Sequence, residues 1–112
     1  MGTYDSENLQ NIRDNTVPLE TVKSGEIVGS ATAAQMPNIP CKRVKFKAVI
    51  GNAGNVYIGA SGVTKVDGAT DTTTGLELDA GEDSGWIEVN NLNRFYYICD
   101  NAGDDLVYLA LI

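Results

Sequence analysis

The chain has 112 residues, a formal net charge of −7 at pH 7 and no histidine. Its acidity argues against general nucleic-acid binding, because neutralising phosphates requires a basic surface. The lack of histidine removes the usual general base and the commonest metal ligand, so we expect neither an enzyme nor a cofactor or metal site. The length is that of one domain with a core of its own.

The apolar segments of the chain are too short to cross a bilayer. The most apolar run, residues 106–112, is far shorter than the ~20 residues that a spanning helix needs. The N-terminus lacks the basic and then apolar layout of a signal peptide. We therefore expect a soluble protein that is made in the cytoplasm and has no membrane partner.

The beginning of the chain differs in composition from the rest. Residues 1–16 are polar, with Tyr4, Leu9 and Ile12 as their apolar anchors. So few apolar side chains cannot build a core. We predict an extended N-terminal arm over residues 1–22 that contacts a partner or neighbouring subunit through these three side chains. A disordered terminus is the alternative, since chain ends are commonly loose.

Residues 23–112 carry short apolar runs separated by glycine, asparagine and proline turn signals, without a long helical period. This pattern predicts an all-β domain, a small antiparallel β-sandwich or jelly-roll-like barrel of about eight strands. In chain order we expect strands at 17–22 and 26–33 joined at Ser24-Gly25, a proline connector at 36–40, a loop or weakly paired ribbon at 62–75, a strand at 76–78, a turn at 79–85, a strand at 86–89 and a turn at 90–93.

Two stretches of the chain are nearly repeated. Residues 45–58 and 94–109 each run from a basic residue and Phe through apolar residues to Asn-Ala-Gly and a second apolar run. Asn-Ala-Gly tolerates the positive φ of a tight turn, so each stretch is predicted to be a β-hairpin. The second copy has the extra residues Asp105 and Leu106, and an insertion of two keeps later side chains on their original faces.

The first strand of the first repeat alternates in character. Val44, Phe46, Ala48 and Ile50 share one face, which we expect to point into the core. The other face carries a basic ladder of Arg43, Lys45 and Lys47. This ladder is a candidate contact for a partner, and the alternative is a solvated strand face with weak cross-strand ion pairs.

The last strand is apolar on both faces. One face carries Leu106, Tyr108, Ala110 and Ile112, and the other carries Val107, Leu109 and Leu111. One face can fill the core, but the second needs a cover. We expect that Val107, Leu109 and Leu111 form a homo-oligomer interface, unless the strand is central and buried on both faces.

Two smaller groups of residues carry side chains that can form sites. Cys41 and Cys99 make no zinc motif, and they would be too far apart for a disulfide if the two hairpins packed in the same direction. An opposed packing would allow a disulfide, so their pairing stays open. Carboxylate and amide oxygens at residues 100–105 could bind Ca²⁺, but their spacing is that of ordinary turn chemistry.

Four segments carry a family resemblance, namely residues 35–44, 52–59, 78–84 and 91–96. They resemble small virion proteins of tailed bacteriophages, of the capsid decoration (cement) and head-fibre type. The resemblance implies a structural virion protein on the capsid surface, a homo-oligomer such as a trimer, whose partner is the major capsid protein or another virion protein. The arm side chains and the basic ladder would then be its contacts.

The alternative is a carbohydrate- or receptor-binding module of a phage fibre or tail. Exposed aromatic side chains are what stack on sugars in such modules, and the candidates here are Tyr57, Trp86 and Tyr96. This alternative requires that these rings be accessible.

Overall fold

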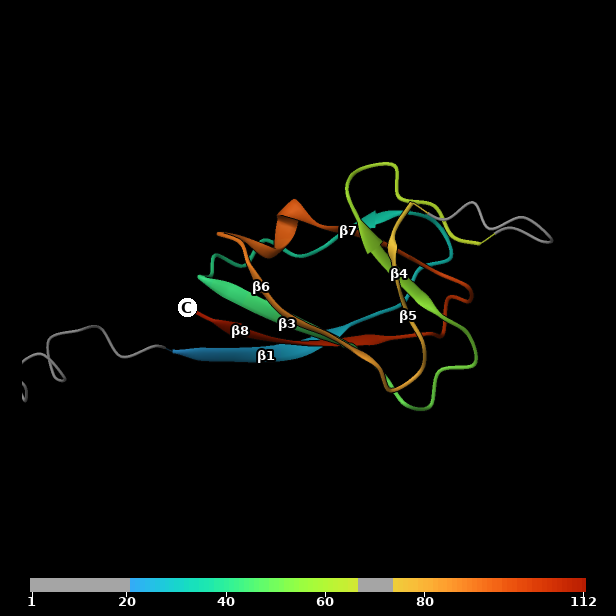
Figure 1. Ribbon diagram of the computed structural model, residues 1–112, viewed down its shortest axis with the longest axis horizontal. Helices are drawn as coiled ribbons and strands as arrows, with labels where there is room; N and C mark the ends of the chain where they lie inside the picture. Colours follow the sequence, from blue (N-terminus) through green and yellow to red (C-terminus); the bar gives the residue numbers. More distant parts are fainter. Residues whose placement is uncertain (1–20, 67–73) are drawn as a thin grey trace, which may run out of the picture.

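The computed structural model describes residues 21–66 and 74–112. Strands and one short 3-10 helix follow in the order β1 (Val22–Ile27), β2 (Ala34–Gln35), β3 (Arg43–Ala48), β4 (Val56–Gly59), β5 (Leu76–Leu78), β6 (Asp83–Glu88), η2 (Leu92–Arg94), β7 (Tyr96–Cys99) and β8 (Leu106–Leu111). They form two four-stranded sheets, sheet A in the order β1-β8-β3-β6 and sheet B in the order β2-β7-β4-β5 (Figure 1). The predicted all-β sandwich of about eight strands is confirmed.

The strand pairs are nested. β4 pairs with β5, β3 with β6, β2 with β7 and β1 with β8, all antiparallel. The chain therefore follows the path of one long hairpin whose tip lies between β4 and β5. The rolled-up hairpin also places β3 beside β8 and β4 beside β7. This double-sheet arrangement is the jelly roll that the sequence pattern allowed.

The prediction that each repeat forms a β-hairpin is wrong. β3 lies in sheet A and β4 in sheet B, and the chain likewise leaves sheet B after β7 and enters sheet A at β8. Each Asn-Ala-Gly segment therefore connects the two sheets. Positive φ in the described residues occurs at Gly62, Gly81 and Gly85, and not in either Asn-Ala-Gly. A local strand-turn-strand pattern does not specify whether the chain returns to the same sheet.

The first strand also differs from its prediction. β1 runs without a break through Ser24-Gly25, and residues 28–33 are not a strand. Gly25 lies opposite Tyr108, and a Cβ atom at this position would be 3.0 Å from the Tyr108 hydroxyl oxygen. Gly25 therefore makes room for an aromatic ring, where the sequence suggested a turn. Most of the strand expected at 17–22 lies outside the described residues.

The segments around β5 and β6 are closer to expectation. The strand predicted at 76–78 is β5, and a turn follows it in which the Glu82 amide donates to the Asp79 carbonyl oxygen at 2.9 Å. Residues 83–85, however, belong to β6 rather than to the turn. The pairing of β3 with β6 shifts between Lys45 and Lys47, where Gly85 has φ +73°. A bulge of this kind needs glycine for its backbone conformation.

The connection between β4 and β5 is partly described. Val63 is buried, and the backbone amides of Thr64 and Thr74 each donate to the other residue's hydroxyl oxygen at 3.0 Å. This reciprocal pair fits the weakly paired ribbon expected at 62–75. Residues 67–73 of that segment lie outside the described residues.

The core lies between the two sheets and contains the inward side chains of both. Its members are Ile27, Met36, Ile39, Val44, Phe46, Ala48, Val56, Ile58, Leu78, Leu92, Tyr97, Cys99, Leu106, Tyr108 and Ala110. The inward face predicted for β3 is confirmed except at Ile50, which is 81 % exposed because the strand ends at Ala48. Phe46 packs edge-to-face on Phe95 with ring centroids 5.4 Å apart. Burying a side chain of that size contributes roughly 1.5–3 kcal/mol.

Within the described residues, no helix has the length and hydrophobicity to pass through a membrane. The first described strand, β1, begins at Val22, at the predicted boundary between arm and domain. Tyr4, Leu9 and Ile12 lie outside the described residues.

Candidate functional site

The predicted contact residues of β3 and β8 lie next to each other on one surface. The register pairs Arg43 with Leu111, Lys45 with Leu109 and Lys47 with Val107. Paired residues of neighbouring strands share a face, so the basic ladder and the apolar stripe form adjacent columns. We call this surface the sheet A outer face. From β1 to β6 it comprises Val22, Ser24 and Glu26, then Leu111, Leu109 and Val107, then Arg43, Lys45 and Lys47, and finally Glu88, Trp86 and Asp83.

The central position of β8 does not by itself cover its second face. β8 has β1 on one edge and β3 on the other, and Leu106, Tyr108 and Ala110 are buried as predicted. On the outer face Val107 is 38 % and Leu109 is 36 % exposed. Two neighbouring aliphatic side chains at the middle of a sheet are therefore open to contact by another surface. The homo-oligomer interface assigned to them stays a prediction, and docking to another protein through the same side chains is a competing use of this face.

The charges of the sheet A outer face are arranged by strand. The ammonium nitrogen of Lys45 lies 3.7 Å from a carboxylate oxygen of Asp83, and Arg43 lies opposite Glu88 in the register. An exposed ion pair of this kind contributes at most about 1 kcal/mol. Lys45, Lys47, Asp83, Val107, Tyr108 and Leu109 line a depression of about 300 Å³. The three basic side chains therefore share one face, as predicted, and Lys45 forms a cross-strand ion pair of the kind that the alternative, a solvated strand face, implies. The role of the ladder as a partner contact stays a prediction.

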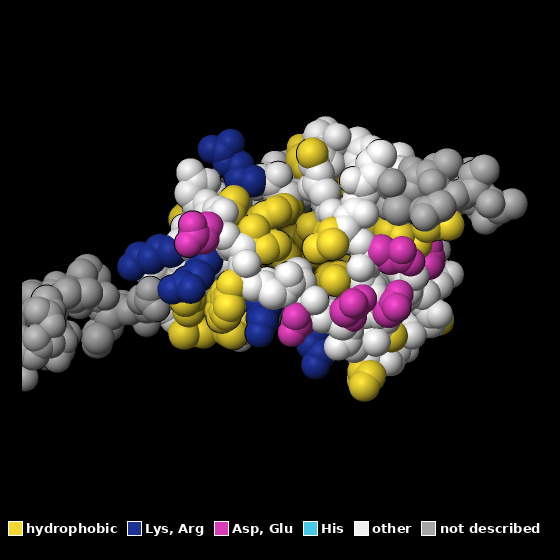
Figure 2. Space-filling view, in the orientation of Figure 1, with side chains coloured by type: hydrophobic (Ala, Val, Ile, Leu, Met, Phe, Trp, Pro, Cys, Tyr) yellow, Lys and Arg dark blue, Asp and Glu magenta, His cyan; other side chains and the backbone are white. Residues whose placement is uncertain are grey.

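Seen as a whole, the charges separate along the body. In Figure 2 most of the Lys and Arg side chains on the visible face lie toward the end where the C-terminus is marked in Figure 1, and most of the acidic side chains lie toward the other end. Among the described residues on this face, the cations therefore gather at one end of the body and the carboxylates at the other.

The three aromatic candidates for sugar stacking do not lie together. Trp86 is 44 % exposed on sheet A, and the Arg43 guanidinium carbon and the Lys45 ammonium nitrogen lie 5.8 Å and 5.5 Å from its ring centroid. Cations at this distance from an indole ring form cation–π contacts. Tyr57 is 1 % exposed in sheet B, which contradicts its candidacy, and Tyr96 is half-buried in the same sheet. The rings form no common platform.

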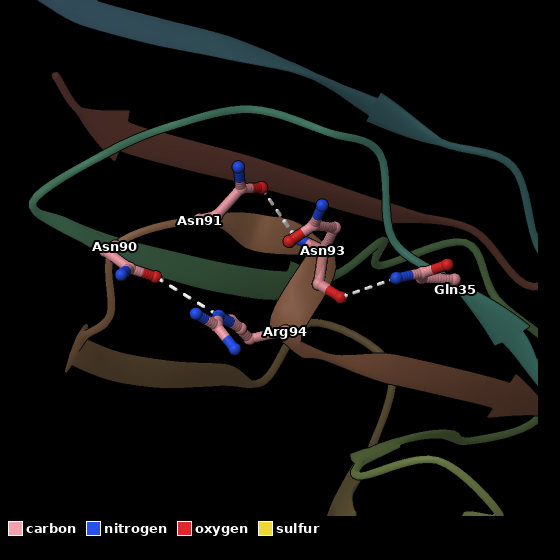
Figure 3. Close-up of a pocket in the computed structure, with 5 residues that line it drawn as sticks. All are labelled: Gln35, Asn90, Asn91, Asn93 and Arg94. Carbon is pink, nitrogen blue, oxygen red and sulfur yellow. Dashed lines mark hydrogen bonds between the residues drawn. The ribbon is translucent and has the colours of Figure 1, made fainter.

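A second surface feature was not predicted as a site. Gln35 of β2 and four residues around η2 line a pocket of about 450 Å³. The four are Asn90, Asn91, Asn93 and Arg94. Figure 3 shows their amide and guanidinium groups arranged around the pocket, with Gln35 reaching toward Asn93 and Arg94 lying against Asn90. The run of amides and one arginine at 90–94 is the sequence signal for this pocket, but the same run is also typical of a turn.

Asn91 holds the pocket wall in place. Its side-chain oxygen accepts hydrogen bonds from the backbone amides of Ile39 at 3.0 Å and Asn93 at 2.9 Å, and its side-chain nitrogen donates to Asn38 at 2.8 Å. Leu92, the next residue, is fully buried in the core. An asparagine that caps a short helix and ties it to a neighbouring segment leaves little freedom to the side chains around it.

No family model matches this chain. A search of curated proteins also finds no match. A search of solved structures finds a chain from the endospore appendages of Bacillus, which form a family of disulfide-linked pili. That chain is 15 % identical to this one, and the match covers 85 % of this chain and 92 % of that chain with a TM-score of 0.35. A similarity of that size carries no argument about fold or function.

The two cysteines are free thiols. Cys99 is buried in the core, and Cys41 is half-buried with its thiol donating to the Val89 carbonyl oxygen at 3.3 Å. Burial raises the pKa of both thiols, which keeps them protonated at neutral pH. The open question of a Cys41–Cys99 disulfide is answered in the negative for this fold.

The oxygen ligands at residues 100–105 are used within the protein. Asp104 is 1 % exposed and accepts hydrogen bonds from the amides of Ala53 and Gly54 at 2.9 and 3.2 Å. Asp100 accepts from the Asn55 amide, and Asp105 from the Gly29 amide. Among the described residues, no group of three or more His, Cys, Asp or Glu side chains is placed to hold a metal ion. Turn and loop chemistry therefore explains these carboxylates, as the spacing suggested.

Proposed function

We propose that this protein is a structural virion protein that decorates the capsid of a tailed bacteriophage and docks through the sheet A outer face. The observation that carries the proposal is the adjacency of two columns on one exposed sheet, Val107, Leu109 and Leu111 of β8 beside Arg43, Lys45 and Lys47 of β3. The sequence resemblance to decoration proteins supports the phage context. The lack of histidine favours a structural over a catalytic role.

The two columns have different physical roles in docking. The apolar column loses water on contact, at roughly 25 cal/mol per Å² of buried apolar surface. The basic column selects a partner with acidic side chains opposite β3 and speeds the encounter. Glu26 on β1 and Asp83 and Glu88 on β6 flank these columns. Because acidic residues border the basic column, only a matching arrangement of charges on the partner is tolerated, which orients the docked module.

Modest contacts are sufficient for decoration. A capsid presents the same docking site at many lattice points, and an oligomer such as a trimer binds several of these sites at once. The second contact of a linked pair is intramolecular, so the overall affinity exceeds that of one contact. The major capsid protein is the proposed partner, and the N-terminal arm with Tyr4, Leu9 and Ile12 is proposed as a second contact to the capsid or a neighbouring subunit.

Co-sedimentation with phage heads that lack this protein tests the docking surface. The change Lys47→Glu is expected to weaken binding by about tenfold or more, because it places a like charge opposite an acidic partner. Lys23→Glu is the matched control, since Lys23 pairs with Ala110 and leaves β1 on the other face. Equal binding of the two variants would contradict docking through this face.

A second pair of variants tests the apolar column. Leu109→Thr is expected to weaken binding to heads, while Leu76→Thr is not, although Leu76 is an exposed strand leucine with a larger exposed fraction, 52 % against 36 %. Sedimentation of the isolated protein distinguishes docking to the capsid from association with a second copy of this chain. If Leu109→Thr dissociates a homo-oligomer instead, the face is a subunit interface and capsid docking through it is wrong.

Deletion of residues 2–16 tests the arm. It is expected to reduce binding to heads without changing the melting temperature of the β-domain, because the core cluster from Ile27 to Ala110 is left intact. Unchanged binding would remove the arm from the proposal and leave the sheet A outer face as the contact.

A further inference from the structure

The pocket beside η2 contains hydrogen-bonding groups that have no partner among the described residues. The Arg94 Nε donates to the Asn90 side-chain oxygen at 3.3 Å, and the Gln35 side-chain nitrogen donates to the Asn93 carbonyl oxygen at 2.8 Å. Within 21–66 and 74–112, the two terminal nitrogens of Arg94 form no hydrogen bond or ion pair. The Gln35 side-chain oxygen and the Asn90 side-chain nitrogen are likewise without a partner in this part of the chain. Donors and acceptors therefore face the same pocket.

The charge of the pocket is unusual for this protein. Its lining contains one cation, Arg94, and no carboxylate, in a chain whose net charge is −7. On the sheet A outer face, by contrast, the ammonium nitrogen of Lys45 has a carboxylate oxygen of Asp83 at 3.7 Å. A guanidinium whose Nε is held by Asn90 presents its remaining N–H groups as a planar fork, and this geometry matches a carboxylate with two parallel hydrogen bonds.

The amides define the rest of the ligand. Side-chain amides donate and accept at once, as Gln35, Asn90 and Asn93 can around this pocket, and hydroxyl groups do the same. The volume of about 450 Å³ falls in the range of roughly 300–1,000 Å³ that is typical of small-ligand sites. The anchoring of Asn91 and the burial of Leu92 hold this wall before a ligand arrives.

We infer that this pocket binds an acidic saccharide. The carboxylate of a uronic acid residue pairs with the Arg94 fork, and the sugar hydroxyls exchange hydrogen bonds with Gln35, Asn90 and Asn93. The site is separate from the three aromatic residues considered for sugar stacking, because none of these lines the pocket. It would add recognition of an anionic glycan to a module whose proposed structural role uses another surface, and it stands whether or not that role is correct.

Backbone amide NMR with three probes tests the inference. Trigalacturonate is expected to shift the amide signals of residues 90–94 and of Gln35, trigalactose to shift them much less, and acetate to bind more weakly than trigalacturonate. Trigalactose has a similar hydroxylated scaffold without the carboxylates, and acetate has the carboxylate without the hydroxyls. Equal affinity for acetate and trigalacturonate would overturn the saccharide assignment, and absence of shifts with all three would overturn the site.

Variants assign the binding to the fork. Arg94→Gln is expected to lower the affinity for trigalacturonate by about tenfold or more, and Arg94→Lys to restore only part of it, since an ammonium lacks the planar fork. Arg43→Gln is the matched control, because it removes the same charge from the sheet A outer face. Gln35→Ala tests a second pocket-lining residue, at an exposed position. Unchanged affinity in Arg94→Gln would show that the fork does not bind the probe. An equal loss in Arg43→Gln would show that net charge rather than this pocket causes the loss.

Discussion

The two Asn-Ala-Gly connections have the same tripeptide and opposite roles. The first, residues 49–55, leads from β3 to β4, and the second, residues 100–105, leads from β7 to β8. They are joined by backbone bonds, from the Val49 amide to the Asp105 carbonyl oxygen and from the Asp100 amide to the Asn55 carbonyl oxygen. Only the second contributes carboxylates, which accept from the amides of the first. The carboxylates of the second connection therefore hold the backbone of the first in place, and we call this arrangement the clamp. The shared tripeptide does not indicate this difference.

Asp104 is the centre of this clamp. Its carboxylate accepts from the backbone amides of Ala53, Gly54 and Asn101 and from the Asn101 side chain. Asp104→Ala removes the acceptor of these four partly buried donors, at about 1 kcal/mol each, so we expect a loss of about 4 kcal/mol in the free energy of unfolding. Urea denaturation measures it.

The counterpart in the first connection is the control for Asp104. Asn55 follows its Gly as Asp104 does, but its side chain donates to Glu77 at an exposed position. Asn55→Ala should cost less than about 1 kcal/mol. If the two variants lose similar stability, the connections are equivalent and the clamp is not asymmetric.

The pH dependence of stability provides a second measure of the clamp. Burial alone raises the pKa of Asp104, but the hydrogen bonds from Gly54, Asn101 and Ala53 outweigh it and the pKa lies below its usual 3.8. A folded pKa below the unfolded value means that the carboxylate stabilises the fold above about pH 4 and that this contribution is lost as pH falls through the folded pKa.

Chemical denaturation at a series of pH values measures this loss against Asp104→Asn, which cannot titrate. The unfolding free energy of the unchanged protein should fall more steeply below about pH 4 than that of the variant. Parallel curves would show that other carboxyl groups cause the acid loss.

The glycines of the two Asn-Ala-Gly segments, Gly54 and Gly103, differ in the space around them. A Cβ on Gly54 would lie 2.6 Å from the Asp100 Cβ and 2.9 Å from a carboxylate oxygen of Asp104, whereas a Cβ on Gly103 would meet nothing within 4 Å. Gly54→Ala should therefore cost about 1–3 kcal/mol. Gly103→Ala should be neutral or stabilising by up to about 1 kcal/mol. Thermal melts of the two variants decide, and a similar shift in both would contradict the close approach at Gly54.

The smallest expected difference in stability is between variants of the two asparagines, Asn52 and Asn101. Asn52 bonds twice to Asp105, with its side-chain nitrogen donating to the carbonyl oxygen and its side-chain oxygen accepting from the amide, both at 2.9 Å. Asn101 bonds once through its side chain, to Asp104 at 3.0 Å. We expect Asn52→Ala to cost about 1–2 kcal/mol and Asn101→Ala about half of that. Urea denaturation of both variants measures the two losses. A larger loss for Asn101→Ala would contradict the reciprocal bridge between Asn52 and Asp105.

Much of the local structure was predictable from alternation. The inward faces of β3 and β8 and the outward positions of Lys45 and Leu109 follow from a period of two, which any extended strand obeys. Ile50 broke the pattern because the strand ended before it. Of the candidate site, the members of each column could therefore be predicted, but not that the two columns are adjacent.

The sequence by itself determined that this is an all-β domain, which side chains of its main strands face the core, and where several turns lie. These properties depend on neighbours in the chain. Only the tertiary structure decided that Lys45 lies beside Leu109, that Gln35 joins Arg94 around one pocket, and that the Asn-Ala-Gly segments pass between sheets. The physical reason is that strand pairing is chosen by the burial of both sheets at once, and local turn chemistry is compatible with either a return or a crossing.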